Sequence, residues 1–158
     1  MIVQDGELIQ IGYLVKDLEG AVKFYMETLD VGPWEIYTFA PPVLRESMVR
    51  GKPSNHDFRI AIASPGQIQV ELIQPLTGRS IYDEYLEQKG EGLHHVKYYY
   101  KDCQKAIQEF EKKGVTVIQS GKFDEDEYYY LDTLKYYGMV IEIGNGGKIR
   151  PPERVISK

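Results

Sequence analysis

The amino-acid sequence predicts an α+β fold in which two copies of one βαβββ module form a curled mixed sheet around a shared cleft. Three observations lead to this prediction. The chain has 158 residues, enough for one domain but too few for two independent cores. Residues 10–24 align without a gap on residues 95–109, which is an internal repeat. In each copy a strand-like alternation runs into a Lys-Asp pair and then into apolar residues at helical spacing.

The first module begins with a strand over residues 9–15, whose apolar side chains alternate. Asp17 is a favourable helix N-cap, and the following helix has an apolar face made of Leu18, Ala21, Val22, Tyr25 and Leu29. Gly32-Pro33 is expected to end this helix. Three strands should follow, with Pro65-Gly66 as a tight turn between the last two: 34–39, 58–63 and 68–74.

Residues 40–55 are the longest segment without clear periodicity, and they contain Pro41-Pro42 and Pro53. Long segments of this kind are often active-site lids, so we expect a mobile lid here. The segment between the modules reads as a linker with a short helix over residues 81–88.

The second module repeats the pattern of the first. After a strand over 95–100, Asp102 should cap a helix with the apolar face Cys103, Ala106, Ile107 and Phe110, and Gly114 should stop it. Tyr137-Gly138 lies where the last hairpin should turn, and the expected strands are 115–118, 128–132 and 139–143. We therefore divide one domain, 1–158, into module 1 (about 7–75), the linker (76–91), module 2 (92–145) and a tail (146–158).

Composition narrows the classes of function. The formal net charge is −5, and no basic stripe is visible in either half, which argues against nucleic-acid binding. Apolar runs stay far below the roughly 20 residues that a membrane helix needs. The N-terminus lacks the features of a signal peptide and Cys103 is the single cysteine, so a cytoplasmic protein with a small-molecule partner is expected.

Strand alternation predicts which polar residues share a face. In the first strand of each module Gln10 and His95 lie opposite the apolar set, and in the last strand of each module Glu71 and Glu142 do the same. Each module thus contributes one residue from its first strand and one carboxylate from its last. We predict that these four residues meet in the cleft.

Imidazole, carboxylate and amide groups together suit a divalent cation such as Zn²⁺, Ni²⁺, Co²⁺ or Mn²⁺, with coordination positions left open for water or substrate. Two buried carboxylates would also be hard to keep ionised without a cation between them. Lys97 and Tyr99 share the face of His95, and Arg59 could point the same way. These three are the predicted substrate-binding residues.

The stretches QIGYLVKDLEGAVKFYMETLDVGPW, IQVELIQPL, GEGLHHV and YYGMVIEI resemble the vicinal-oxygen-chelate superfamily (glyoxalase, bleomycin resistance proteins and dioxygenases). Among its members, the methylmalonyl-CoA epimerases are the most similar. The resemblance covers nearly the whole chain and implies one divalent metal held by Gln10, Glu71, His95 and Glu142, and a homodimer. It also implies proton abstraction next to a carbonyl through a metal-stabilised enolate, with Glu71 and Glu142 as catalytic acid and base.

Two departures from the epimerase pattern keep other functions open. Glutamine at position 10 is similar to animal glyoxalase I, whereas the epimerases carry histidine there. The second acid/base of the epimerases has no clear counterpart, since Asp57 and Glu46 read as surface loop residues. The leading hypothesis is an isomerase or epimerase acting on an acyl-CoA. The alternatives are a glyoxalase I-type lyase acting on a thiol hemithioacetal and a non-catalytic binder; an extradiol dioxygenase would need histidine in place of Gln10.

Overall fold

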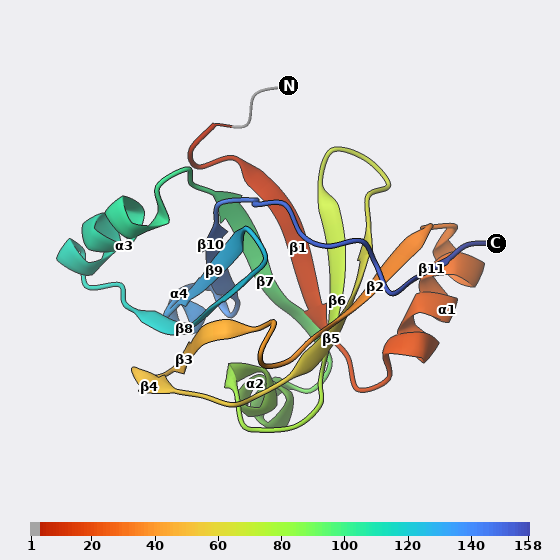
Figure 1. Cartoon of the computed structure of the whole chain (residues 1–158), viewed down its shortest axis with the longest axis horizontal. Coiled ribbons are helices and arrows are strands. Elements are labelled where there is room, and N and C mark those ends of the chain that lie inside the picture. The colour runs from red at the N-terminus through yellow and green to blue at the C-terminus, as the bar shows by residue number, and fades with distance from the viewer. Residues whose placement is uncertain (1–3) are drawn as a thin grey trace.

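The computed structural model describes residues 4–158 and is drawn in Figure 1. Within these residues it contains one mixed sheet of eleven strands and four helices. The strands are β1 (Leu8–Leu14), β2 (Trp34–Phe39), β3 (Arg45–Val49), β4 (Lys52–Pro53), β5 (Phe58–Ala63), β6 (Gln69–Pro75), β7 (Gly92–Tyr99), β8 (Val117–Phe123), β9 (Asp126–Leu131), β10 (Val140–Gly144) and β11 (Arg154–Ile156). The helices are α1 (Leu18–Leu29), α2 (Ile81–Lys89), α3 (Cys103–Lys112) and α4 (Leu134–Tyr137). The α+β class and the mixed sheet are confirmed, but the sheet is not strongly curled, although we expected a curled one.

The two repeats lie side by side in the sheet, whose order is β11-β2-β5-β6-β1-β7-β10-β9-β8-β3-β4. Each repeat has its first strand parallel to its last, β1 with β6 and β7 with β10. The repeats join through the antiparallel pair β1 and β7, in which Gly12 is the partner of His95. The four central strands are therefore the first and last strands of both modules.

Helix α1 begins as its sequence predicts, because the Asp17 side chain accepts a hydrogen bond from the Gly20 backbone N–H at 3.1 Å. Its end differs from the expectation. The helix stops at Leu29 because Asp30 adopts a left-handed conformation with φ of 59°, before Gly32-Pro33 is reached. The apolar face of α1 packs on one face of the sheet, against a core cluster that includes Trp34, Ala61 and Leu72.

Helix α3 occupies the equivalent place in the second repeat. Asp102 accepts a hydrogen bond from the Lys105 backbone N–H at 3.0 Å, and Gly114 follows the helix with φ of +79°. Its buried residues pack against Tyr129, Leu131 and Ile143. Figure 1 shows α1 and α3 at opposite ends of the molecule. Across residues 4–158, no helix is both long enough and apolar enough to cross a membrane.

Residues 40–55, the predicted lid, have regular secondary structure that their sequence did not indicate. They contain β3 and β4, and β3 pairs with β8 of the other module, with Met48 opposite Ser120. Backbone hydrogen bonds to a second module hold this segment in the sheet. The C-terminal tail contains β11, which pairs with β2. Figure 1 shows the chain after β10 crossing the molecule to reach that edge.

The ends of several elements shift from the predicted positions. Where we expected a hairpin turn at Tyr137-Gly138, the short helix α4 precedes Gly138, which has φ of +72°. Strand β8 continues to Phe123, because its partner β9 begins at Asp126 instead of at residue 128. The earlier start of β9 brings an additional aspartate into the sheet.

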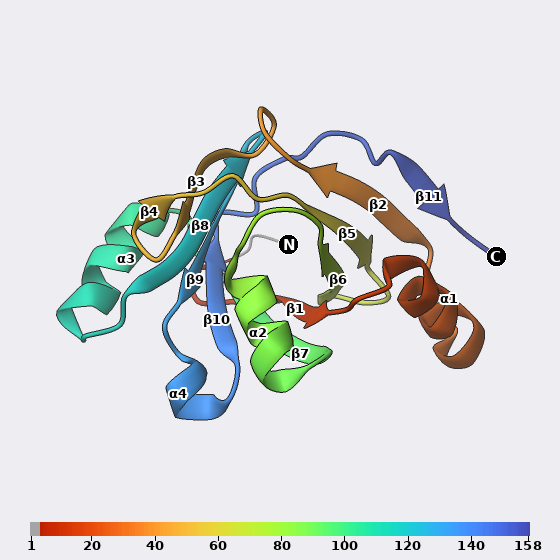
Figure 2. The same ribbon diagram turned by 90° about the horizontal axis from the view of Figure 1, so that it is seen from below.

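A third core cluster lies on the face of the sheet that α1 and α3 leave free. It joins strands that are distant in the sheet, since the rings of Phe39 in β2 and Phe123 in β8 are stacked with centroids 3.9 Å apart. Helix α2 contributes Tyr82 and Tyr85 to the same cluster, and Figure 2 shows it near the middle of the molecule, between α4 and α1. This face holds the predicted site.

Candidate metal centre

The four predicted ligands meet around one atom, Nε2 of His95. It lies 3.2 Å from Oε1 of Gln10, 3.4 Å from Oε2 of Glu71 and 3.0 Å from Oε2 of Glu142. All four side chains are buried. One ligand atom each from Glu71, His95 and Glu142 lie within 4.8 Å of one another, so this group could hold a metal ion. Their function as ligands remains a prediction.

Glycines make room for the longer side chains of this site. A Cβ on Gly12 would overlap the ring of His95, its partner across β1 and β7. A Cβ on Gly144 would lie 2.5 Å from Cε of Lys97. Both glycines have the same strand parity as the site residues, so any side chain at either position would compete for the space that His95 and Lys97 occupy.

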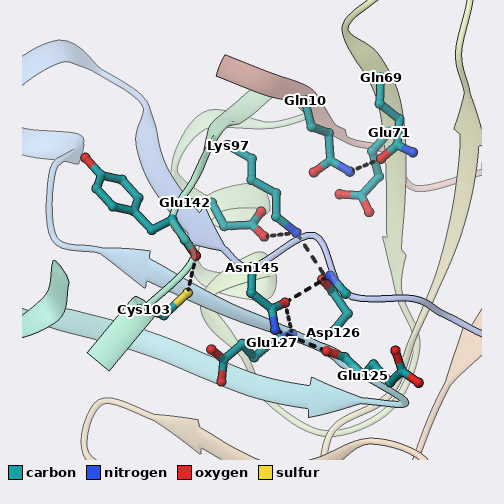
Figure 3. Close-up of polar contacts among 12 residues, drawn as sticks. Gln10, Gln69, Glu71, Lys97, Cys103, Glu125, Asp126, Glu127, Glu142 and Asn145 are labelled. Atoms are coloured by element: carbon teal, nitrogen blue, oxygen red, sulfur yellow. Dashed lines mark hydrogen bonds and ion pairs between the residues drawn. The ribbon is translucent and has the colours of Figure 1, made fainter. Parts of the chain in front are cut away.

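A buried lysine joins the site to a second carboxylate. The ammonium group of Lys97 lies 3.0 Å from Oε1 of Glu142 and 3.6 Å from Oδ2 of Asp126, as Figure 3 shows. Burial alone would lower the pKa of Lys97. The carboxylates of Asp126, Glu142 and Glu71 outweigh that effect and raise the pKa above its usual value, so Lys97 is charged.

The balance of charge supports a divalent cation. Three buried carboxylates, Glu71, Asp126 and Glu142, face one ammonium group, which leaves an excess of two negative charges if all are ionised. Oε2 of Glu142 makes no hydrogen bond within residues 4–158, although it lies beside His95. One divalent cation would neutralise the excess and give this oxygen a partner. The residues present therefore fit the group that the sequence predicted.

The two glutamates differ in electrostatic environment. Burial raises the pKa of Glu71 to about 7, and the nearby Glu142 adds to the increase. Burial acts on Glu142 in the same direction, but Lys97 and His95 outweigh it and hold the pKa of Glu142 well below its usual value. In the metal-free protein Glu71 is thus the carboxyl that can hold a proton near neutral pH, and Glu142 is ionised.

This difference predicts a pH-dependent stability of the metal-free protein. A carboxyl whose pKa is raised on folding contributes stability below its unfolded pKa, which is lost as pH rises through the folded pKa. For Glu71 that window runs from 4.5 to about 7. The shift corresponds to roughly 3 kcal/mol. We expect Glu71→Gln to remove this loss. The measurement is the free energy of unfolding in urea at pH 5 and at pH 7.5, for wild type and variant, and the change between the two pH values is then compared.

The comparison with the variant is needed because buried histidines change the free energy of unfolding with pH in the opposite direction to Glu71. Burial lowers the pKa of His94 and of His56, so each of them favours the folded state more as pH rises through the same range. Those contributions are common to wild type and variant and cancel in the difference. An identical pH dependence in both proteins would contradict the assignment of the raised pKa to Glu71.

The site opens into a cavity of about 420 Å³ on this face of the sheet. Lys97 and Tyr99 line it, as the sequence predicts. Arg59 does not. Its side chain lies on the opposite face of β5, where the guanidinium contacts Oε1 of Glu19 in α1 at 2.9 Å. The expectation that Arg59 points into the cleft is therefore wrong. Its neighbours in β5, Phe58 and Ile60, face the cavity, so Arg59 faces the other side of the sheet.

Sequence reasoning missed two polar residues of the site. Gln69 accepts a hydrogen bond from the side-chain amide of Gln10 at 2.5 Å. Gln69 lies two residues before Glu71 in the same strand, so strand alternation could have identified it. Asp126 lies outside the strand that we predicted and had no such signal. Asp57 accepts hydrogen bonds from Thr77, and Glu46 pairs with Lys122 at the surface, so neither carboxylate lies in the site. Cys103 is buried in the core, as expected.

Solved structures share this fold. The hypothetical protein BH1468 from Bacillus halodurans superposes with a TM-score of 0.69 at 22% identity, covering 96% of this chain and 100% of its own. A methylmalonyl-CoA epimerase in complex with methylmalonyl-CoA and NH4+ superposes with a TM-score of 0.65 at 19% identity, covering 94% and 100%. The methylmalonyl-CoA epimerase from Mycobacterium tuberculosis gives 0.62 at 17% identity, with 96% and 94% covered.

Sequence comparison points to the same group of proteins. An uncharacterized protein of Bacillus subtilis, YqjC, is 28% identical over 111 residues, which is 70% of this chain and 69% of YqjC. Residues 9–130 match the family description "Glyoxalase/Bleomycin resistance protein/Dioxygenase superfamily". The match includes three of the four predicted ligands and most of the chain. The chain belongs to the glyoxalase/bleomycin resistance protein/dioxygenase superfamily.

Proposed function

We propose that this protein is a metal-dependent isomerase of the epimerase type, which moves a proton on the carbon next to a carbonyl, with an acyl-CoA as substrate. The observation that carries the proposal is the pair of buried glutamates with opposed environments, Glu71 and Glu142, on either side of His95. Pairs of acids whose pKa values are pushed apart are typical of acid–base catalysis. The acyl-CoA is suggested by the fold shared with an epimerase in complex with methylmalonyl-CoA.

Gln10, Glu71, His95 and Glu142 would hold the divalent cation, which supplies a Lewis acid that favours negative charge on the substrate's carbonyl oxygen. The proton transfers belong to the two glutamates. Oε2 of Glu142, which has no hydrogen bond within the described chain, accepts the proton as the electron pair of the C–H bond moves into the carbonyl group. The Glu71 carboxyl, displaced from the cation by the substrate and protonated, returns a proton to the opposite face. The reverse sequence converts the other epimer.

The arrangement of strands supports a two-sided site. Glu71 comes from β6 and Glu142 from β10, and the strands of Gln10 and His95, β1 and β7, lie between them in the sheet. Lys97 holds Oε1 of Glu142, so Oε2 is the oxygen that could bind the cation and, once the substrate has displaced it, take part in proton transfer. A homodimer stays a prediction that size-exclusion chromatography with light scattering would check.

The test separates proton removal from proton return. Metal-loaded protein is incubated in D₂O with each C2 epimer of methylmalonyl-CoA, and deuterium incorporation and epimerisation are followed by NMR. We expect Glu71→Gln to slow epimerisation by about a hundredfold or more, the usual range for loss of an acid or base. Deuterium exchange of the epimer whose C–H bond faces Glu142 should persist.

Glu109→Gln is the matched control, because Glu109 is an exposed glutamate on α3 that pairs with Lys112. It should leave both rates unchanged. Absence of deuterium exchange with wild type, on the CoA thioester and on smaller thioesters, would rule out the proposed reaction. Equal loss of deuterium exchange and of epimerisation in Glu71→Gln would rule out the separate roles of the two glutamates.

A glyoxalase I-type lyase acting on a thiol hemithioacetal is the second candidate, and Gln10 favours it. The Gln10 amide lies beside His95 and is held in place by a hydrogen bond to Gln69. The residue that differs from the epimerase pattern is therefore ordered within the site. Turnover of the methylglyoxal–glutathione adduct without exchange on thioesters would establish this candidate in place of the epimerase.

A further inference from the structure

His94, the residue before the predicted ligand His95, lies on the same side of the sheet as its neighbour, and both rings pack against the ring of Tyr130. In a regular strand, adjacent side chains point to opposite faces. The pairing of β1 with β7 is irregular here. Gly12 is the partner of His95, but the next residue of β1 pairs with Leu93 and not with His94. His94 is therefore the additional residue of a β-bulge, a feature that redirects side chains and is frequent next to active sites.

The bulge brings the two imidazole rings into contact. Nδ1 of His94 lies 3.1 Å from Nδ1 of His95, and both side chains are fully buried. A hydrogen bond between two ring nitrogens needs one N–H donor and one lone pair, so one histidine donates and the other accepts. The direction of this hydrogen bond depends on which of the two Nδ1 atoms carries the proton.

The other nitrogen of His95 determines that direction. Nε2 of His95 faces the other three predicted ligands at 3.0–3.4 Å. To bind a cation, Nε2 must present its lone pair, so the proton of the neutral His95 ring belongs on Nδ1. His94 must then accept that proton's hydrogen bond through Nδ1, and the proton of its own ring belongs on Nε2.

Packing alone does not explain a histidine at position 94. Its ring stands nearly perpendicular to the rings of Tyr82, Tyr85 and Tyr130, with centroids 4.9–5.6 Å apart. Nε2 of His94 makes no hydrogen bond within residues 4–158. A buried donor without a partner costs about 1–3 kcal/mol, which an apolar residue would avoid. The hydrogen bond to His95 is the contact that an apolar residue could not make.

We propose that His94 is a positioning residue for His95. It accepts the Nδ1 proton of His95 and thereby holds that ring in the tautomer and orientation that present Nε2 to a divalent cation. Histidine ligands generally donate their second nitrogen to a carboxylate, a backbone carbonyl or water, and here a histidine on a β-bulge takes that place. The inference rests on the metal site of the proposed function and is independent of the proposed reaction.

Two substitutions test the hydrogen bond through metal affinity. His94→Leu fills the position but removes the acceptor, and we expect it to weaken Zn²⁺ binding roughly 10- to 100-fold, the usual effect of losing a partner of a ligand. His94→Asn places an amide oxygen near the position of Nδ1, so it should recover most of the affinity. The measurement is competition for Zn²⁺ with a chelating dye, and circular dichroism must show that each variant is folded.

His56→Leu is the matched control. His56 is also a buried histidine whose Nε2 lacks a hydrogen bond within the described chain, and its Nδ1 lies 2.9 Å from Oγ of Ser54. His56 does not line the cavity of the site. The substitution should change urea unfolding but leave the affinity for Zn²⁺ unchanged. Loss of a buried imidazole as such is thereby separated from loss of the contact with His95.

The position of the ring protons is a readout that a merely structural role would not move. Protein with ¹⁵N-labelled histidine is loaded with Zn²⁺, and long-range ¹H–¹⁵N correlation spectra identify the protonated nitrogen of each ring. We expect a proton on Nδ1 of His95 and on Nε2 of His94. A proton on Nδ1 of His94 in the Zn²⁺-loaded protein would overturn the inference.

The outcomes distinguish this inference from the proposed function. Equal Zn²⁺ affinity of wild type and His94→Leu, or equal loss in the leucine and asparagine variants, overturns the role of His94 while the metal site stands. Folded wild type that binds no Zn²⁺ overturns the inference together with the metal site. Zn²⁺ binding with the expected ring protons, but without exchange on thioesters, supports the role of His94 and contradicts the proposed reaction alone.

Discussion

Replacing His95 or Glu142 by alanine is expected to abolish the binding of one divalent metal ion per chain. Nε2 of His95 is the atom around which Gln10, Glu71 and Glu142 gather, so its loss removes the centre of the site. Loss of Glu142 removes a charged ligand and also releases Lys97. Since changes to groups that merely orient ligands cost 10- to 100-fold in metal affinity, we expect at least about a hundredfold here.

The measurement is metal content by elemental analysis after equal exposure to Zn²⁺, Ni²⁺, Co²⁺ and Mn²⁺ and removal of free metal. Wild type should retain about one ion per chain, since residues 4–158 contain one such cluster of ligands. Glu109→Gln should behave as wild type, and circular dichroism must show that each variant is folded. Folded wild type without metal, or full retention in both alanine variants, would mean that the cleft binds its ligands without this ion.

Replacing Lys97 by methionine is expected to lower the free energy of unfolding of the metal-free protein by about 3–5 kcal/mol. The variant keeps the volume of the side chain but leaves Glu142 and Asp126 buried without their cation, and breaking one partner of a buried ion pair typically costs this much. The loss should be smaller in metal-loaded protein, because the bound ion compensates part of the negative charge.

Lys112→Met is the control, because Lys112 is an exposed lysine that pairs with Glu109 at 2.6 Å on α3. Exposed pairs contribute less than about 1 kcal/mol, so urea unfolding should barely change. The double variant Lys97→Met/Asp126→Asn should recover part of the loss, since one buried charge is removed with the other. Equal losses in the two lysine variants would show that Lys97 is not paired as the structure has it.

Local alternation explains why so much of the site could be predicted from the sequence. Parity within a strand depends only on neighbouring residues, and the repeat identifies corresponding strands of the two modules. Gln10 and His95, and likewise Glu71 and Glu142, were assigned to one face in this way, and the structure brings them together. The helix starts at Asp17 and Asp102 were equally accessible, because a capping hydrogen bond spans three residues.

Pairings between distant segments could not be predicted from local pattern. Residues 40–55 looked irregular because their strands are short, and their partner β8 lies in the other module. Arg59 lies on the opposite face of β5 from Phe58 and Ile60, and only the assembled sheet shows which of the two faces meets the cavity. By itself the sequence determined the repeat, the strand faces and the four clustered side chains. Only the tertiary structure decided that Asp126 joins them and pairs with Lys97, because strand register and long-range ion pairs depend on the whole sheet.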